Sequence, residues 1–292
     1  MVVFVIDVIC NPVAGHGIGK KTGALIETVL QKKPLPFRMH YTTCPGEASA
    51  LARDAARRGS ELVLAIGGDG TAFEAAQGLA GTKTALGVIP AGTGNDFVKT
   101  IGVPQNSLEA LSHILSCPVR ETDVGMLNGR LFLNEIGTGF DVMTLDYTEK
   151  VKHLCRGILP YLYGVLQTIF RFRSIPLTYA VDDGEEVTEN VFIIGAANGR
   201  QFGGGITIAP DAKVDDGLMD VIVVGHIRKR DLPARLLGLM QGKILSFPET
   251  KFIRARKLRF STPNMRVNAD GEILSMDQAE VEIMPGALLM RR

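Results

Sequence analysis

The sequence predicts an α/β protein: an N-terminal α/β domain with a parallel sheet, followed by a second, mainly antiparallel β domain. In residues 1–128, short apolar runs alternate with segments of helical periodicity, which is typical of βαβ units. After Arg120 the chain carries short strand patterns separated by turn residues, as antiparallel sheets do. A length of 292 residues accommodates two domains. We expect the boundary between Arg120 and Leu131.

The N-terminal elements alternate in a regular order. Expected strands cover Val2–Ile9, Phe37–Thr43, Leu62–Ile66 and Ala85–Ile89, and expected helices cover Lys20–Gln31, Ala48–Arg58 and Thr71–Leu79. Parallel sheets of this kind bind ligands at the carboxyl ends of their strands. The loops after these strands are therefore the expected binding region.

The second half contains seven strand patterns and two helical segments. The strand patterns are RLFLNEIGTGF, LTYAVDD, NVFIIGAAN, LMDVIVVG, KLRFS, MRVNADGE and AEVEIM. The helical segments are Lys150–Phe172 and Asp231–Gln241. They would interrupt the antiparallel sheet.

Composition excludes several classes of protein. A net charge of +1, without aromatics interleaved among the cations, gives no reason to expect a nucleic-acid partner. The start MVVFVIDVIC reads as a buried strand rather than a signal peptide, and no run of 18 uncharged apolar residues exists. Four widely spaced cysteines suggest neither a zinc site nor a disulfide framework, which favours a reducing cytoplasm.

The stretch GGDGT, residues 67–71, lies between an expected strand and an expected helix. Glycines let a phosphate approach backbone N–H groups, and a helix N-terminus attracts anions. The carboxylate of Asp69 would repel phosphate unless a divalent cation lay between them, so the loop indicates a metal–nucleotide complex. The alternative is an ordinary tight turn between strand and helix.

Two more loops follow strands of the same sheet. They are NPVAG, residues 11–15, and PAGTGNDF, residues 90–97. The stretch GHGIGKKT fits neither the P-loop nor the dinucleotide fingerprint, because its glycines have the wrong spacing. Three glycine-bearing loops at three strand ends can converge on one ligand.

NPVAG, TTCPGEA, GGDGT and GVIPAGTGNDF, in this order, resemble the diacylglycerol kinase catalytic domain. The whole chain, including NGRQFGGGITIAPDAKVDDGLMDV and NADGE, is similar to the soluble bacterial lipid kinases of that family. The wider superfamily includes sphingosine, ceramide and NAD kinases. The resemblance implies an ATP-binding domain over residues 1–128, a β-sandwich lipid-substrate domain over 129–284, and a last strand, about 285–292, that can return to the first domain. ATP would lie in the cleft between the domains.

The resemblance also assigns the nucleotide contacts. They would come from Asn11, Pro12, Val13, Ala14, Gly15, Thr42, Gly67, Gly68, Asp69, Gly70, Thr71, Glu74 and Thr93. The family usually has Asn two residues after the threonine of GGDGT, whereas this chain has Phe73. We expect Asn95 or a backbone group to compensate, or the nucleotide pose to differ.

In VNADGE, two carboxylates lie two residues apart, and an extended segment would present both on one face. Two neighbouring carboxylates can raise each other's pKa values, which suits a general base. The alternative is an ordinary turn, because DGE is a common turn sequence. The resemblance implies that Glu272 accepts the proton of the substrate hydroxyl. Asp270 would hold Glu272 in place or help to bind metal.

KVDDGLMD is by itself compatible with a solvated acidic turn. The resemblance implies a structural Mg²⁺ held by Asp216 and the backbone carbonyls of Lys213 and Leu218, with Asp123 linked to the metal through water. Oxygen ligands of this kind suit Mg²⁺. Metal binding would then stiffen the domain junction.

Two segments are candidates for peripheral membrane contact. Residues 150–177 combine apolar and aromatic side chains (Leu159, Tyr161, Leu162, Val165, Leu166, Ile169, Phe170) with flanking Lys152, Arg156, Arg171 and Arg173. Residues 226–259 hold ten Lys or Arg and two acids, which anionic lipids would attract. The alternatives are a helix packed on the sheet and a solvated charged face. Sheet edges in the second domain would allow a homodimer.

Together these observations favour an ATP- and Mg²⁺-dependent lipid kinase that phosphorylates diacylglycerol to phosphatidate. Phosphatidylglycerol, a sphingoid base or ceramide are alternative acceptors. A nucleotide-binding regulator without turnover is an alternative of another class, suggested by Phe73.

Overall fold

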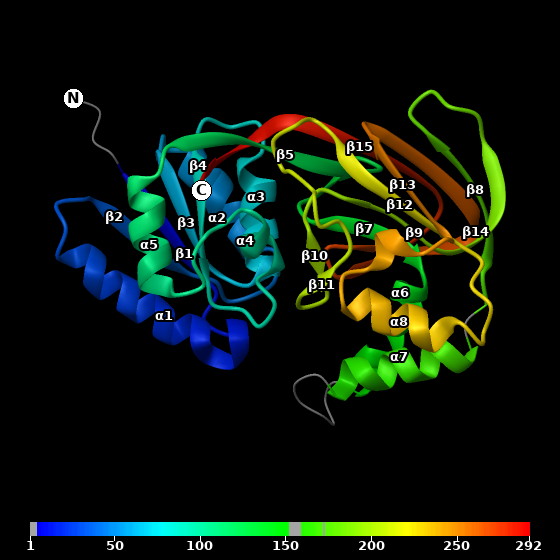
Figure 1. Cartoon of the computed structure of the whole chain (residues 1–292). Helices are drawn as coiled ribbons and strands as arrows, with labels where there is room; N and C mark the ends of the chain where they lie inside the picture. The colour runs from blue at the N-terminus through cyan, green and yellow to red at the C-terminus, as the bar shows by residue number, and fades with distance from the viewer. Residues whose placement is uncertain (1–4, 152–158, 172) are drawn as a thin grey trace.

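The computed structural model describes residues 5–151, 159–171 and 173–292, and Figure 1 shows two domains. The N-terminal domain is α/β, and the C-terminal domain is a β-sandwich-like unit with antiparallel strands, which confirms the two-domain prediction. In these ranges no helix has the length and apolar character needed to cross a bilayer.

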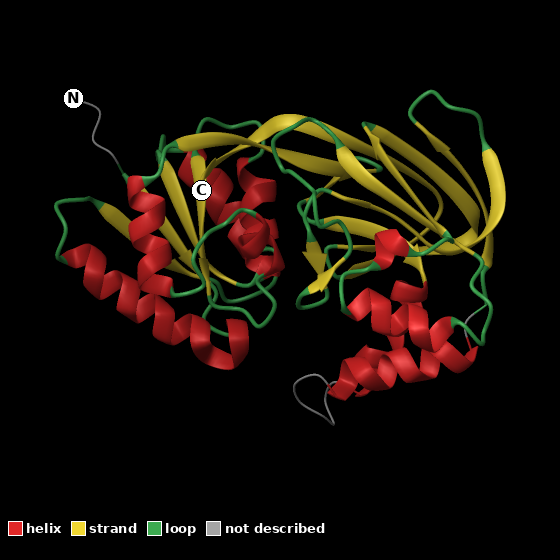
Figure 2. Cartoon of the chain, viewed as in Figure 1, coloured by secondary structure: helices red, strands yellow, loops and turns green. Residues whose placement is uncertain are grey.

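Four strands form the centre of the N-terminal domain. They are β1 (Ile6–Cys10), β2 (Phe37–Tyr41), β3 (Leu62–Gly67) and β4 (Ala85–Pro90). All pair in parallel, in the order β4-β3-β1-β2. The helices α1 (Ala14–Gln31), α2 (Glu47–Arg57), α3 (Asp69–Leu79), α4 (Asp96–Thr100) and α5 (Ser107–Ser116) surround this sheet, as Figure 2 shows.

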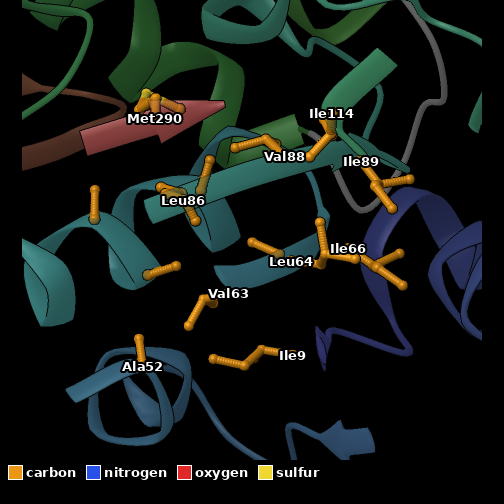
Figure 3. Packing of buried hydrophobic residues seen from close by; sticks show 14 of the residues in the cluster. Ile9, Ala52, Val63, Leu64, Ile66, Leu86, Val88, Ile89, Ile114 and Met290 are labelled. Carbon is orange, nitrogen blue, oxygen red and sulfur yellow. The ribbon is translucent and has the colours of Figure 1, made fainter. Parts of the chain in front are cut away.

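The core of this domain lies between the sheet and the helices. Every residue of β3 and β4 is buried, as expected for strands covered on both faces. Figure 3 shows Leu64 and Leu86 among the packed side chains, together with Ile114 of α5 and Met290 from the end of the chain. Met290 pairs in parallel with Leu86, so the last strand extends the N-terminal sheet.

The C-terminal domain is built from antiparallel strands. They are β5 (Val119–Leu127), β6 (Arg130–Phe132), β7 (Glu135–Gly139), β8 (Ile175–Val181), β9 (Val187–Ala197), β10 (Gln201–Phe202), β11 (Ile206–Thr207), β12 (Met219–Gly225), β13 (Thr250–Ala255), β14 (Lys257–Ala269) and β15 (Glu272–Arg291). The helices are α6 (Phe140–Val151), α7 (Leu159–Arg171), α8 (Leu232–Met240) and the 3-10 turn η1 (Ile244–Ser246). The 20-residue β15 pairs with β14 and β5 and continues into the first domain, which connects the two cores.

Several sequence expectations need correction. KLRFS and MRVNA belong to one strand, β14, whose register shifts between Ser261 and Met265. The helix expected from Lys20 starts at Ala14, although its first turn is broken by left-handed residues 15–17. The sequence did not separate α6 from β7, because RLFLNEIGTGF runs without a break into the helix. Of the segment expected as a helix over 150–172, residues 152–158 and 172 lie outside the described residues, as do residues 2–4 of the first strand.

Candidate active site

A cavity of about 440 Å³ opens at the carboxyl ends of the parallel strands. The sequence-predicted residues that line it are Asn11, Val13, Ala14, Gly15, Thr42, Gly68, Asp69, Gly70, Thr71, Glu74 and Thr93. The predicted residues Pro12 and Gly67 are not among the lining residues. The cavity is also lined by residues of the quoted loops TTCPGEA and PAGTGNDF that were not among the assigned contacts: Thr43, Cys44, Pro45, Ala48, Gly92 and Gly94. The structure therefore brings the three glycine loops, and the loop after β2, around one space.

Glycine is needed where these loops approach one another. A side chain at Gly67 would lie 2.3 Å from Thr71 Oγ1, so the turn between β3 and α3 closes only without one. Gly15 has φ +56°, and a Cβ there would lie 2.3 Å from the carbonyl oxygen of Ala91. The loops after β1 and β4 are thus in direct backbone contact.

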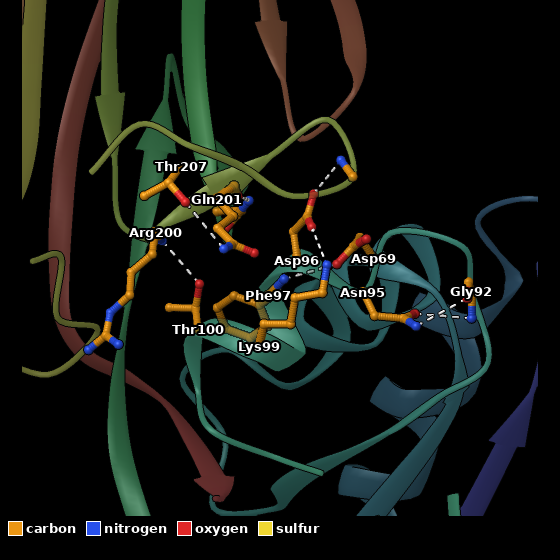
Figure 4. Close-up of polar contacts among 12 residues, drawn as sticks. Asp69, Gly92, Asn95, Asp96, Phe97, Lys99, Thr100, Arg200, Gln201 and Thr207 are labelled. Carbon is orange, nitrogen blue, oxygen red and sulfur yellow. Dashed lines mark hydrogen bonds and ion pairs between the residues drawn. The ribbon is translucent and has the colours of Figure 1, made fainter. Parts of the chain in front are cut away.

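Polar side chains fix the loops around the cavity. Asn11 Nδ2 donates to Thr71 Oγ1 over 3.2 Å, which joins the loop after β1 to the start of α3. Glu74 Oε2 accepts the backbone N–H of Ala48 at 3.2 Å. Asn95, whose φ is +53°, uses its amide to bind both the N–H and the carbonyl oxygen of Gly92 (Figure 4). These contacts hold the backbone amides in place before any ligand arrives.

Asp69 lines the cavity, and Figure 4 shows Asp96 close to it. Asp69 Oδ1 accepts the N–H of Phe97 at 3.0 Å. Burial raises the pKa of Asp69, and the nearby charge of Asp96 raises it further. Asp96 pairs with Lys99 at 3.1 Å and accepts the N–H of Gly204 at 2.7 Å. Because Gly204 belongs to the turn between β10 and β11, this bond links the two domains.

The segment carrying Asp270 and Glu272 is a tight turn, not the extended strand that the sequence suggested. Asp270 and Gly271 have φ values of +47° and +90°, and Ala269 pairs with Glu272 across the turn. Two consecutive left-handed residues are typical of a type I′ hairpin, for which Asp-Gly is a preferred sequence. The two carboxylates therefore do not share a strand face.

The two acids have different environments. Asp270 Oδ2 accepts the N–H of Leu133 at 2.6 Å, and Oδ1 accepts those of Asn134 and Glu135 at 2.9 and 3.0 Å. Burial raises the pKa of Asp270 to about 6 although these three amides lower it. The side chain of Glu272 is 55% exposed and pairs with Arg130. Asp270 is thus buried and fixed, whereas the paired side chain of Glu272 is open to solvent.

Further buried acids stand beside this turn. Asn268 connects them: its Nδ2 donates to Glu135 Oε1 at 3.3 Å, and its Oδ1 accepts the N–H of Gly271 at 2.9 Å. Burial raises the pKa of Glu135 well above its ordinary value, and Asp141 and Asp270 raise it further. Burial also raises the pKa of Asp141 to about 6. The turn is therefore part of a connected acidic network.

The acidic loop at residues 213–218 lies against Asp123. Asp123 donates its N–H to the carbonyl oxygen of Val214 at 2.6 Å, and its carboxylate accepts the N–H groups of Gly217 and Gly286 at 2.7 and 2.8 Å. Asp216 pairs with Arg254 and accepts the N–H of Leu218 at 3.2 Å. Asp123 thus holds the loop that contains Lys213, Asp216 and Leu218 against the bend of β15.

The loop at residues 213–218 offers oxygen donors, which are the ligands that a hard cation such as Mg²⁺ prefers. Within the described ranges, no group of three or more acidic, histidine or cysteine side chains is arranged around a metal position. A cation here would therefore need backbone carbonyls beside the Asp216 carboxylate. The neighbouring Asp220 is 2% exposed and has a buried Oδ2 without a hydrogen-bond partner, while its Oδ1 and the carboxylate of Asp216 both pair with Arg254.

Comparison with known proteins agrees with these features. Residues 6–127 match the diacylglycerol kinase catalytic domain, and residues 134–291 match the YegS C-terminal NAD kinase beta sandwich-like domain. The chain belongs to the diacylglycerol kinase family of lipid kinases. It is therefore a phosphotransferase, and membership of a kinase family implies ATP as co-substrate.

Individual relatives span nearly the whole chain. A Mycobacterium tuberculosis "diacylglycerol kinase" is 29% identical over 98% of this chain and 94% of its own length. A "probable lipid kinase YegS-like" of Chromohalobacter salexigens is 32% identical over 84% of this chain and 80% of its own. The crystal structure of a "putative diacylglycerol kinase" from Bacillus anthracis superposes with a TM-score of 0.80 at 28% identity, covering 99% of this chain and 97% of that one.

The departure from the family pattern at Phe73 has a structural counterpart in this lipid kinase. Phe73 is 6% exposed and lies in the core of the first domain. The guanidinium of Arg130 lies 5.9 Å from the centre of its ring, and the same guanidinium pairs with Glu272. A cation–π contact of this kind is weakly attractive. Phe73 therefore connects α3, through Arg130, to the turn of Asp270 and Glu272.

Sequence reasoning missed Asp96, Asn268, Glu135 and Asp141. Asp96 stands within PAGTGNDF, so its position after a strand was available as a signal. Glu135 and Asp141 lie inside apolar strand and helix patterns, where nothing in the sequence shows that they face the Asp270 turn.

Proposed function

We propose that this protein is an ATP- and Mg²⁺-dependent lipid kinase that transfers the γ-phosphate of ATP to the hydroxyl of diacylglycerol and yields phosphatidate. The observation that carries the proposal is the 440 Å³ cavity lined by four strand-end loops, three of them rich in glycine. Its volume falls in the range of about 300–1,000 Å³ of small-molecule sites. Nucleotide contacts would come from the predicted lining residues, from Gly92 and Gly94, and from Pro12 and Gly67 as supports of the turns.

Backbone amides supply most of the proposed phosphate contacts. The loops after β1, β3 and β4 converge, and α3 begins at Asp69 beside them. Amides and a helix N-terminus stabilise phosphate charge without a change in protonation. Bound between Asp69 and the phosphates, Mg²⁺ would neutralise both groups. Asp69 lines the cavity and Asp96 lies close to it, so the γ-phosphate would bind beside this pair and face the second domain.

The turn of Asp270 and Glu272, here called the catalytic turn, supplies the proton acceptor in this proposal. Asp270 anchors the turn through three backbone amides, and Glu272 extends from it. Glu272 would accept the proton of the lipid hydroxyl as the hydroxyl oxygen bonds to the γ-phosphorus and the bond to ADP breaks. Its exposed contact with Arg130 is worth little, so an acceptor can displace it.

We also propose that Asp216, with the backbone carbonyls of Lys213 and Leu218, holds a second, structural Mg²⁺. Asp123 would bind it through water. The support is the oxygen donors of the loop and the buried, unpartnered Oδ2 of Asp220 beside it. Such an ion would stiffen the junction where β15 passes between the domains. The protein would act in the cytoplasm, peripherally on the membrane, and the edge strand β13 offers a surface for a homodimer.

Radiolabelled ATP and a panel of diacylglycerol, phosphatidylglycerol, sphingosine and ceramide test the substrate. Thin-layer chromatography should show labelled phosphatidate with diacylglycerol as acceptor. Label on a different lipid would replace diacylglycerol as the substrate. Saturable ATP binding with no labelled lipid would refute the kinase proposal and favour a regulator without turnover, for which the contact of Arg130 with both Phe73 and Glu272 would then be the structural reason.

The proposed base is tested by Glu272→Gln. We expect kcat to fall by about 100-fold or more, the usual contribution of a general base, while the ATP dissociation constant stays within about twofold. Glu280→Gln is the matched control, because Glu280 is an exposed carboxylate on the same strand. Equal turnover in both variants would remove Glu272 from the mechanism.

A further inference from the structure

The outer faces of α7 and α8 expose large apolar side chains. Tyr163 and Leu166, three residues apart on α7, are 41% and 47% exposed. Leu237 and Met240, three residues apart on α8, are 58% and 62% exposed. Spacing of three places each pair on one side of its helix. Leu237 and Met240 are among the most exposed large apolar side chains of the described residues.

The inner faces of the same helices share one hydrophobic core. Val165 of α7 and Leu232, Leu236 and Leu239 of α8 pack into a cluster with Phe140 of α6. Both helices therefore cover the same side of the C-terminal domain, where Figure 1 shows them together. Their inner faces explain the fold, and their outer apolar residues remain for another partner.

A group of cations adjoins these apolar faces. Ser174 Oγ lies 2.8 Å from His226 Nδ1, which joins the end of α7 to the segment before α8. This contact brings two basic stretches together: Arg171 and Arg173 from the first, and Arg228, Lys229 and Arg230 from the second. The acid in residues 226–231, Asp231, pairs with Arg228 and Arg230. Together the two basic stretches hold five cations against this one acid, so they are strongly positive.

Helix α7 is connected, through α6 and β7, to the turn of Asp270 and Glu272. Strand β7, whose Glu135 binds Asp270, continues directly into α6. Helix α6 packs on α7, where Thr144 Oγ1 lies 3.3 Å from Thr168 Oγ1. Arg266 of β14 pairs with Asp146 of α6. A lipid reaching this side of the domain would lie on helices that are connected, through α6 and β7, to the turn that precedes Glu272.

We propose that the outer faces of α7 and α8, together with the cations of residues 171–173 and 228–230, form the surface that docks on an anionic bilayer. This docking surface rests on the proposed function, since it presents a membrane-resident acceptor to the enzyme. Apolar side chains enter the headgroup boundary while the neighbouring cations attract anionic headgroups. A second copy on the same surface would bring like charges into one interface, which disfavours self-association there.

Vesicles of equal parts phosphatidylglycerol and phosphatidylcholine test the docking surface by sedimentation. Leu237→Glu with Met240→Glu should lower the partition coefficient by about 100-fold, roughly tenfold for each lost apolar side chain. The matched control is Leu25→Glu with Leu108→Glu, at side chains that are each 43% exposed on α1 and α5. Glutamate is a good helix former, so the three helices that carry these substitutions should remain folded, which circular dichroism verifies.

Charge is tested separately. Arg173→Glu with Lys229→Glu should weaken vesicle binding by about 30-fold or more, since each cation near the surface contributes about fivefold. The control Lys32→Glu with Lys33→Glu changes the net charge equally at exposed positions of the other domain. The effect should shrink as salt is raised. Equal vesicle binding by the docking variants and their controls would overturn the proposal.

Turnover separates this proposal from the kinase proposal. With a short-chain diacylglycerol dispersed in solution, the docking variants should retain wild-type kcat within about twofold, and with vesicles they should lose turnover in proportion to binding. If the wild type phosphorylates no lipid, the kinase proposal fails, but vesicle binding still tests the docking surface. If the variants bind vesicles normally but differ from the wild type in the molecular mass measured by sedimentation velocity, the surface is a self-association site and the docking proposal is wrong.

Discussion

Replacing Gly92 with alanine should force apart two of the loops that form the cavity. A Cβ at this position would lie 2.5 Å from Gly68 Cα and 2.8 Å from Asn95 Oδ1. Ordinary contacts begin near 3.4 Å, so the backbone at Gly68 must retreat by about 0.9 Å. Asn95 cannot absorb the change, because its amide is already bound to the N–H and carbonyl oxygen of Gly92.

The predicted consequence is a loss both of catalytic efficiency with ATP and of stability. Gly68 and Gly92 both line the cavity, and a misplacement of about 1 Å can cost about 100-fold in rate. We therefore expect kcat/KM for ATP to fall by about 100-fold. Overpacking of this kind costs about 1–3 kcal/mol in the free energy of unfolding.

Titration calorimetry with ADP, kinase assays and thermal unfolding measure these effects. Gly225→Ala is the matched control, because its Cβ would have its nearest neighbour at 3.6 Å, an ordinary contact, far from the cavity residues in sequence. Gly92→Ala protein that binds ADP as tightly as the wild type, with an unchanged melting temperature, would refute the reasoning from loop contact.

Two further predictions concern buried carboxylates. Burial raises the pKa of Asp7, but hydrogen bonds from Ser60 and His40 and the charge of Arg58 outweigh it and hold the pKa below 3.8. Asp7→Asn should therefore lower the free energy of unfolding by about 3 kcal/mol at neutral pH. A carboxylate whose pKa is lower in the folded than in the unfolded state stabilises the fold at a pH above the unfolded-state pKa, and this gain is lost as the pH falls through the folded-state pKa. Urea titrations should therefore show that the stability difference between Asp7→Asn and the wild type shrinks below pH 3.8. A stability difference independent of pH would contradict this. Asp123→Ala should leave two backbone amides without an acceptor, costing about 2–6 kcal/mol, and should abolish any rise in melting temperature with MgCl₂; a rise that persists would count against the metal loop.

The sequence by itself determined the loops and the strands that carry them. NPVAG, GGDGT and PAGTGNDF each follow an apolar run, and the chain direction of a βαβ unit places the ends of parallel strands at one edge. Local chemistry was sufficient there, since glycines, strand periodicity and helix periodicity are all properties of short segments. The Asp-Gly turn differs: its residue preference was visible in the sequence, but the extended segment that we expected there was wrong.

Only the tertiary structure decided what surrounds the turn of Asp270. Its carboxylate binds amides more than 130 residues away in sequence, and Glu272 meets Arg130 across 142 residues. Burial, which raises the pKa of Asp270 and Glu135, exists only once the strands have packed. Partners so distant in sequence leave no periodic signal, because their meeting depends on the pairing of β7, β14 and β15 rather than on neighbouring residues.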